Sequence, residues 1–447
     1  MKNRLIPCFI SQSAATSLFL LAVCLAVTPL VRAQQDGAGN KYELKGVTDR
    51  SDAIYHVNEL VGFEFTLSNN GKPVSNGEVT YVISKDGQSL SDGRKVISNG
   101  RIILSGQMSE PGFLRCTVTY VLKDSSELMA MAAAGIDPLQ IKSGTPAPDD
   151  FDIFWDAQKQ KLASIPMEPL LTPVESHRDG IEVYDLKLNC LESIAPVSGF
   201  FAKPKGAQPR SLPAMMRVHG AGIWSASRGE AIAGAEMGML SVDINAHGVA
   251  NEKPREYYAE LEQTLLKGYS HRGRHDRESC YFFGMYLRMV RAMNFLCAQP
   301  EWDGQVLIVN GVSQGGAQAI AAAGLDSRVS IIGAGVPALC NQPGPVSGWP
   351  WLVPYENGKP DPKILQASRY FDPVNFAART KAEAVFSVGF VDTVCPPSTV
   401  YMAYNNISGE KQIVNKPLMG HESPEYIHDI FTGIFQAHVQ RMKKNVE

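Results

Sequence analysis

The segment 311–315 reads Gly-Val-Ser-Gln-Gly, which is the pattern Gly-x-Ser-x-Gly. An apolar run at 306–309 precedes it and an alanine-rich run at 316–323 follows it, so a strand should lead into the segment and a helix should leave it. In that setting the serine occupies a sharp turn, and its hydroxyl stands clear of both elements. Glycines flank the serine because a Cβ there would collide where strand and helix pass closely. The segment therefore predicts Ser313 as a nucleophile.

A serine hydroxyl needs a base to take its proton, and the base needs a carboxylate to fix its tautomer and stabilise its positive charge. After a Gly-x-Ser-x-Gly turn these groups follow in the order acid, then histidine. Asp392 lies directly after the strand-like segment 386–391. His421 follows the last clear strand, 412–414, by a short loop that contains glycine. The order predicts Asp392 as the acid and His421 as the base.

Each assignment has an alternative interpretation. His421 could be a histidine that caps a loop, and Asp392 could form an Asx-turn or cap the helix that follows. Glu422 competes with Asp392 as the group that orients His421. His428 and His438 fall within the predicted terminal helix, where we expect surface or packing residues.

The tetrahedral intermediate of acyl transfer carries negative charge on the former carbonyl oxygen, and two backbone N–H groups normally bind it. Gln314 follows the nucleophile at the start of its helix, so its amide is one candidate. The second should come from a loop after an early strand. The segment 219–222, His-Gly-Ala-Gly, follows such a strand, and the Ala221 amide is the predicted donor, although an ordinary strand-to-helix turn would look the same. We expect His219 to pack beneath this loop.

The spacing of the cysteines predicts neither a metal site nor a particular set of disulfide bonds. We also expect no cofactor. The six cysteines beyond the first 33 residues are scattered, without close pairs: Cys116, Cys190, Cys280, Cys297, Cys340 and Cys395. Cys297 lies on an apolar helical stripe and is predicted to be core.

The N-terminus resembles a secretory signal. Lys2 and Arg4 precede an apolar run at 18–27, and residues 31–33, Val-Arg-Ala, fit a cleavage site, so 1–33 is predicted to be a signal peptide of a secreted or periplasmic bacterial protein. A membrane anchor is the alternative, but the run is short for a span.

The formal net charge is −3, and removal of three basic residues with this segment takes it to about −6. That balance argues against a nucleic-acid partner, and we expect none. The basic segment 270–277 could meet an acidic substrate, but we favour a solvated loop.

The rest of the chain divides into two parts that differ in their pattern of expected strands and helices. Residues 34–40 suggest a flexible leader, and 41–141 carries short strands separated by turn dipeptides, which predicts a small all-β sandwich of immunoglobulin-like size. Its clearest strands are 61–67, 79–83, 102–104 and 116–121. From 142 to 447 strands and helices alternate, which predicts an α/β domain with a mostly parallel sheet. Its clearest strands are 213–218, 239–243, 306–309, 384–388 and 412–414, and a helical stripe runs from Phe283 to Cys297.

From about 149 to 445 the chain resembles the acetyl xylan esterase / cephalosporin C deacetylase family, carbohydrate esterase family 7, within the α/β-hydrolase superfamily. The resemblance is carried by segments 150–155, 286–292, 311–316, 370–379, 387–399 and 420–422, of which the last two are the most specific. It implies Ser313, Asp392 and His421 as nucleophile, acid and base. It also implies hydrolysis of small acyl esters, chiefly acetyl, on sugars.

The chain departs from the family pattern at two places near this site. The family usually carries Arg-Gly-Gln where this chain has Asn245, Ala246 and His247. It often has tyrosine where this chain has Ala221, so the backbone donor is kept while the aromatic wall of the acyl pocket changes. The N-terminal β segment is extra to the usual single domain, and the oligomeric state stays open.

Three functions are compatible with these residues. The first is a secreted serine esterase that removes acetyl groups from an oligo- or polysaccharide substrate. The second is a serine peptidase of the prolyl oligopeptidase type, for which about 100 residues of β structure are too few to form a propeller. The third is a non-catalytic carbohydrate-binding protein, which the intact serine, acid and histidine disfavour.

Overall fold

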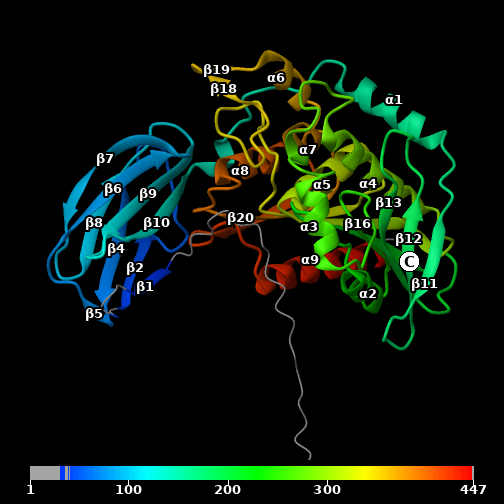
Figure 1. Ribbon diagram of the computed structural model, residues 1–447, viewed down its shortest axis with the longest axis horizontal. Helices are drawn as coiled ribbons and strands as arrows, with labels where there is room; N and C mark the ends of the chain where they lie inside the picture. Colours follow the sequence, from blue (N-terminus) through cyan, green and yellow to red (C-terminus); the bar gives the residue numbers. More distant parts are fainter. Residues whose placement is uncertain (1–30, 36–38, 40, 445–447) are drawn as a thin grey trace, which may run out of the picture.

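The computed structural model describes residues 31–35, 39 and 41–444 (Figure 1). Most of the predicted signal peptide, 1–33, lies outside these residues and stays a prediction. Its last three residues belong to strand β1 (Val31–Gln35), which pairs antiparallel with β2 (Lys41–Thr48). The expected flexible leader is wrong at Gln34 and Gln35, because both pair with β2 in this sheet. Among the helices so described, none has the length and apolar character to cross a membrane.

Residues 31–136, which we call the N-terminal β-region, form two sheets (Figure 1). The first contains β1, β2, β4 (Val61–Asn69), β5 (Lys72–Pro73) and β8 (Arg101–Gly106). The second contains β3 (Ile54–Tyr55), β6 (Glu78–Lys85), β7 (Gln88–Val96), β9 (Gly112–Val121) and β10 (Glu127–Ile136). All pairings are antiparallel except that of β10 with β3.

Alternation of side chains explains the core of the β-region. Along β4, Val61, Phe63, Phe65 and Leu67 are buried, and the residues between them face outward, as the two-residue period of a strand requires. The four strands expected here lie within β4, β6, β8 and β9. Strand β10 was not expected, because its run of methionine and alanine is poor in the β-branched residues that mark strands.

The remainder of the chain is built on a nine-stranded sheet in the order β11-β12-β13-β15-β14-β16-β17-β20-β21. The strands are β11 (Leu170–Val174), β12 (Ile181–Leu188), β13 (Val197–Pro204), β14 (Leu212–Val218), β15 (Leu240–Ile244), β16 (Trp302–Val312), β17 (Ile331–Gly335), β20 (Glu383–Gly389) and β21 (Lys411–Lys416). The strands from β15 to β21 are parallel, while β11, β12 and β13 add antiparallel pairs at one side. The predicted α/β class is confirmed, and the sheet is mixed.

Helices cover both faces of this sheet (Figure 1). Helices α2 (Arg228–Glu236) and α9 (Glu425–Lys444) pack on one face, and α4 (Tyr281–Cys297) and α5 (Gln314–Leu325) pack on the other. The other elements are α1 (Phe151–Ala163), α3 (Arg255–Gln263), α6 (Pro362–Ser368), α7 (Pro373–Ala377), α8 (Pro397–Asn406), the 3-10 turns η1 (Pro138–Gln140) and η2 (Tyr269–His271), and a small hairpin of β18 (Tyr355–Glu356) and β19 (Lys359–Pro360).

Helix α5 approaches strand β14 very closely, and glycines permit it. A Cβ on Gly315 would lie 2.3 Å from the carbonyl oxygen of Val218, and a Cβ on Gly311 would lie 2.6 Å from the same oxygen. Both distances are far below any normal contact with a backbone atom. The predicted reason for the two glycines, a close passage of strand and helix, agrees with these distances.

We predict opposite effects for the same substitution in two helices. Gly315→Ala should destabilise the protein by about 1–3 kcal/mol or more, because rigid backbone must move to admit the methyl group. Gly433→Ala is the matched control, since that glycine lies in α9 with nothing within 4 Å of the added Cβ. It should stabilise by about 0.5–1 kcal/mol through helix propensity. Urea unfolding midpoints measure both, and equal shifts of the two midpoints would contradict the argument.

Candidate active site

Ser313 stands in a strained turn between β16 and α5. Its backbone has φ +58° and ψ −120°, a conformation that residues other than glycine rarely adopt. Neighbouring backbone holds it there, because its N–H donates to the Gly335 carbonyl at 2.8 Å and its carbonyl accepts from the Ala338 N–H at 2.9 Å. The side chain of Ser313 is therefore presented at the carboxyl end of β16, where open α/β sheets bind ligands.

The structure brings Ser313, His421 and Asp392 together. His421 Nε2 lies 2.9 Å from Ser313 Oγ, and His421 Nδ1 lies 2.8 Å from Asp392 Oδ2. Asp392 follows β20 and His421 follows β21, so two neighbouring parallel strands deliver the acid and the base. The geometry suits proton removal from the serine hydroxyl by a histidine whose other nitrogen donates to a carboxylate.

Asp392 also organises its own loop. Its side chain is fully buried, and Oδ1 accepts hydrogen bonds from the Val394 and Cys395 amides, each at 2.8 Å. The Asx-turn considered as an alternative is thus formed by one carboxylate oxygen, while the other oxygen contacts His421. The carboxylate that contacts His421 is that of Asp392 and not that of Glu422.

Two opposing effects set the charge of His421. Burial by itself would disfavour the imidazolium and lower its pKa. The adjacent Asp392 carboxylate and Cys395 together outweigh burial and hold the pKa of His421 well above its usual value of 6.5. The ring is therefore a strong proton acceptor for Ser313.

The loop 219–222 passes beside the nucleophile. A Cβ on Gly220 would lie 3.8 Å from the Cβ of Ser313, and Gln314 is the first residue of α5. Within the described part of the chain, neither the Ala221 amide nor the Gln314 amide donates a hydrogen bond to another protein group. Two unused N–H groups near one hydroxyl are what an oxyanion hole requires.

Neutral histidines support this loop from beneath. His219 Nε2 accepts from the Ala246 amide, so its Nδ1 carries the proton and donates to the Gly220 carbonyl at 2.8 Å. His247 Nε2 lies 2.8 Å from the Gly222 carbonyl, to which it must donate, and its Nδ1 accepts from the Tyr281 hydroxyl. Burial lowers the pKa of His219 to about 4 and that of His247 to about 3. The expected packing role of His219 agrees with this arrangement.

The departure from the family pattern at 245–247 has a structural role. Asn245 Nδ2 donates to the Trp224 carbonyl at 2.6 Å, and Asn245 Oδ1 accepts from the His247 amide. Together with His247, these contacts tie the segment after β15 to the loop that carries Ala221.

Sequence reasoning missed Tyr269, whose buried ring packs on His247. Its hydroxyl donates to Gln314 Oε1 at 2.8 Å and accepts from the Gly222 amide at 3.4 Å. Burial raises the pKa of this hydroxyl, so it stays protonated and able to donate. Trp349 packs against the same ring. No local motif marks Tyr269, because its hydrogen-bond partners lie 45 residues or more away in the sequence.

Arginines of the basic segment 270–277 contact other segments of the protein. Arg274 donates to the Leu352 carbonyl, and Arg277 pairs with Asp150 and lies 4.7 Å from the centroid of the Phe154 ring. Both arginine side chains therefore contact other groups of the protein and are not free in solvent. The expectation of a solvated loop is incomplete for that reason.

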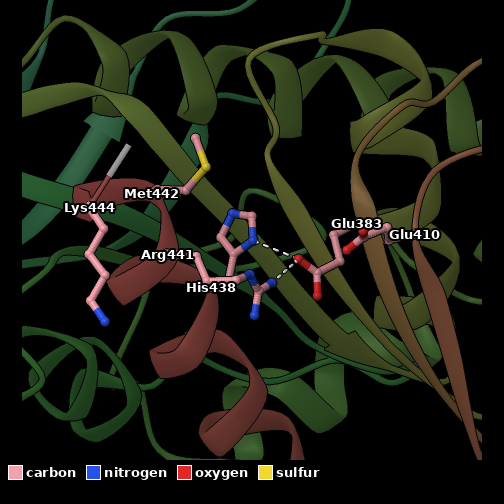
Figure 2. A pocket seen from close by; sticks show the side chains of 6 residues that line it. All are labelled: Glu383, Glu410, His438, Arg441, Met442 and Lys444. Atoms are coloured by element: carbon pink, nitrogen blue, oxygen red, sulfur yellow. Dashed lines mark hydrogen bonds and ion pairs between the residues drawn. The ribbon is translucent and has the colours of Figure 1, made fainter. Parts of the chain in front are cut away.

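A second contact between serine, histidine and carboxylate occurs at the opposite end of the sheet, and Figure 2 shows its histidine and carboxylate, His438 and Glu383. His438 of α9 lies 2.7 Å from Glu383 Oε2 and 3.0 Å from Ser330 Oγ, and Arg441 also contacts Glu383. Ser330 precedes β17 and Glu383 begins β20, so the cluster sits at the amino ends of parallel strands. Ser330 lacks the strained turn of Ser313, and the contact fastens α9 to the sheet. The packing role expected for His438 agrees with its 6% exposure.

The six cysteines considered above are all free, and five of them are buried. Cys297 is half-buried and packs against the main core. Over residues 31–35, 39 and 41–444, no group of three or more histidine, cysteine or carboxylate side chains could hold a metal ion.

The sequence model of the family described as acetyl xylan esterase (AXE1) matches residues 129–346 and 354–433. The chain is 30% identical over 384 residues to acetyl esterase Axe7A of Xylanibacter ruminicola, which covers 84% of this chain and 86% of that protein. An alignment of this length extends beyond the predicted domain at 142–447 and into the N-terminal β-region.

Solved structures support the same comparison. An acetyl xylan esterase from Paenibacillus sp. R4 is 30% identical, with a TM-score of 0.57, and the match covers 67% of this chain and 98% of that chain. Acetyl xylan esterase 1 from Thermoanaerobacterium sp. JW/SL YS485, at 23% identity and a TM-score of 0.53, shares the fold over 67% of this chain and 96% of its own. Both solved chains therefore match about two thirds of the present chain.

We predict that the hydrogen bond from His247 to Gly222 keeps the Ala221 amide in place. His247→Leu should slow fluorophosphonate labelling of Ser313 by about tenfold, less than the 10²- to 10³-fold loss that follows removal of a whole oxyanion donor. His247→Gln is the matched control, because its amide can still donate to the Gly222 carbonyl. Equal labelling rates in the two variants, with unchanged melting temperatures, would show that the loop does not depend on this bond.

Proposed function

Because the chain belongs to the acetyl xylan esterase family and is a carboxylic ester hydrolase, we propose that it removes acetyl groups from carbohydrates through an acyl-enzyme on Ser313. One observation carries the mechanism: His421 lies within hydrogen-bond distance of both Ser313 Oγ and Asp392 Oδ2. No cofactor takes part in the proposed reaction.

In the first half of the reaction, Ser313 Oγ attacks the acetyl carbonyl carbon. His421 Nε2 accepts the hydroxyl proton, and Asp392 stabilises the imidazolium that forms. The carbonyl oxygen becomes an oxyanion between the Ala221 and Gln314 amides, each worth about 2.7–4 kcal/mol of transition-state stabilisation in comparable sites. His421 then gives the proton to the sugar oxygen as the ester bond breaks.

In the second half, water replaces the sugar. His421 takes a proton from the water as it attacks the acetyl-serine, and the same two amides meet the second oxyanion. Collapse of this intermediate releases acetate, and the proton on His421 returns to Ser313. The neutral state of His219 and His247 suits this step, because a permanent cation beside the hole would bind free acetate and slow its release.

Family membership and the relatives' names support an acetylated oligo- or polysaccharide as the substrate. We propose a preference for acetyl over longer acyl groups, as the resemblance implies.

We also propose that the N-terminal β-region is a separate immunoglobulin-like sandwich domain at 41–141, followed by the catalytic domain at 142–447. Support comes from its two sheets, which enclose a core of their own that includes Leu44, Phe65 and Val118. Export through a signal peptide at 1–33 is part of the same proposal, and cleavage after Ala33 would remove three of the five residues of β1.

Acetate release tests the proposed reaction. Purified protein should release acetate from acetylated xylo-oligosaccharides, and Ser313→Ala should lower kcat by a factor on the order of 10⁶. Ser330→Ala is the matched control, because it removes the other serine that contacts a histidine and should leave kcat unchanged.

Other outcomes would redirect the assignment. Faster hydrolysis of butyrate or ferulate esters would contradict the acetyl preference. Cleavage of prolyl-peptide anilides without acetate release would favour a peptidase. Absence of both turnover and fluorophosphonate labelling would leave only a binding role.

The pH dependence of hydrolysis should report His421. The neutral ring is the active base, so kcat/KM should rise with pH through a midpoint above 6.5. Because Asp392 favours the imidazolium, Asp392→Asn should lower that midpoint, and it should reduce kcat by about 10⁴-fold. Glu422→Gln is the control, as it alters the adjacent carboxylate and should leave the midpoint in place. A midpoint that moves in the control and not in Asp392→Asn would reverse the assignment of the acid.

A further inference from the structure

The N-terminal β-region packs directly beside the loop that carries Asp392. In Figure 1 strands β9 and β10 face α8, the helix that this loop enters. The ring of Phe113, at the start of β9, meets the ring of Phe390 edge-on at 4.9 Å and lies 5.6 Å from the ring of Tyr401. All three side chains are at most 2% exposed. Phe390 is two residues before Asp392, so this contact supports the loop at its beginning.

A hydrogen bond supports the same loop at its end. The hydroxyl of Ser398, in the first turn of α8, donates to Asp86 Oδ1. Asp86 lies in the two-residue turn between β6 and β7, with φ +48°, and is followed by Gly87 with φ +90°. Positive φ at both positions is the geometry of a tight hairpin turn of type I′, which leaves the aspartate little freedom. The Asp86 amide also donates to the Phe113 carbonyl at 3.1 Å, which joins the two supports.

An arginine of the N-terminal β-region also interacts electrostatically with the loop that carries Asp392. Arg115, two residues after Phe113, is desolvated, and burial lowers its pKa while the carboxylates of Asp86 and Asp392 counteract that effect. The Nε of Arg115 is buried without a hydrogen-bond partner in the described residues. A cation of the β-region therefore lies within electrostatic reach of the acid in the active site.

We propose that Asp86 and Phe113 are positioning residues for Asp392: they hold the loop 390–398 from both sides and thereby set the direction in which its carboxylate meets His421. The inference rests on the proposed function. The two solved acetyl xylan esterases match about two thirds of this chain at nearly their full length. Here the β-region contributes to the reaction through the position of Asp392.

Removal of the Asp86 side chain tests the proposal. Asp86→Ala should lower kcat about tenfold with KM unchanged, because misplacement of a catalytic group by a fraction of an ångström slows the chemical step more than binding. It should also lower the pH midpoint of kcat/KM, since a displaced Asp392 supports the imidazolium of His421 less well. Asp86→Asn should restore both values, because its amide oxygen still accepts from Ser398.

Two further variants separate positioning from stability. Asp92→Ala alters an exposed aspartate in β7 of the same hairpin and should leave kcat and the midpoint unchanged. Ser398→Ala removes the bond from the other side, and the double variant with Asp86→Ala should be no slower than either single one. If Asp86→Ala does not fold, Ser398→Ala alone carries the test.

The outcomes distinguish this proposal from the proposed function. A lower melting temperature with unchanged kcat and pH midpoint, in an otherwise active protein, would overturn the positioning role alone. Additive losses in the double variant would show that Asp86 acts by a route other than Ser398 and would also overturn it. A wild-type protein that releases no acetate would sink the proposed function itself.

Discussion

The close approach of α5 to β14 is the constraint on which the site depends. With glycine at 311 and 315, the helix comes near enough for the Val218 carbonyl to occupy the space of two side chains. The loop after Val218 then lies beside Ser313, and Gln314 begins α5 directly after the same serine. The serine and both candidate oxyanion donors thus belong to one rigid unit, whose geometry is set by backbone packing and not by flexible side chains.

Burial acts on the site histidines in the same direction, and their partners decide the outcome. His219 and His247 contact carbonyl, amide and hydroxyl groups, none of which stabilises a cation enough to offset the lost water, so both stay neutral. His421 contacts a carboxylate and gains proton affinity. His438 also contacts a carboxylate, yet it lies at the amino ends of the strands, where Ser330 lacks the strained turn of Ser313 (Figure 2). A catalytic histidine in this fold therefore needs a carboxylate partner and a position at the carboxyl ends of the parallel strands.

Much of this arrangement could be predicted from the sequence, because the Gly-x-Ser-x-Gly turn is a local signal and the acid and histidine follow strands in a fixed order. The antiparallel direction of β12 and β13 was missed, although the connection at 189–196 is too short for a parallel crossover. Tyr269 could not be predicted, since its role arises from contacts with distant segments. The pair of Asp86 with Ser398 spans 312 residues and leaves no pattern in either segment.

These long-range contacts matter because the acid does not belong to the rigid unit that holds the serine. Asp392 arrives on β20, which β17 separates from β16, and it stands in a loop whose own turn is held by its carboxylate. His421 therefore bridges two units, the turn that holds Ser313 and the loop that holds Asp392, which follow strands that are not neighbours in the sheet. The first is fixed by the glycine contact with β14. The second has its outer end on the N-terminal β-region, so the alignment of the three side chains depends on contacts with that region as well as on the turn that holds Ser313.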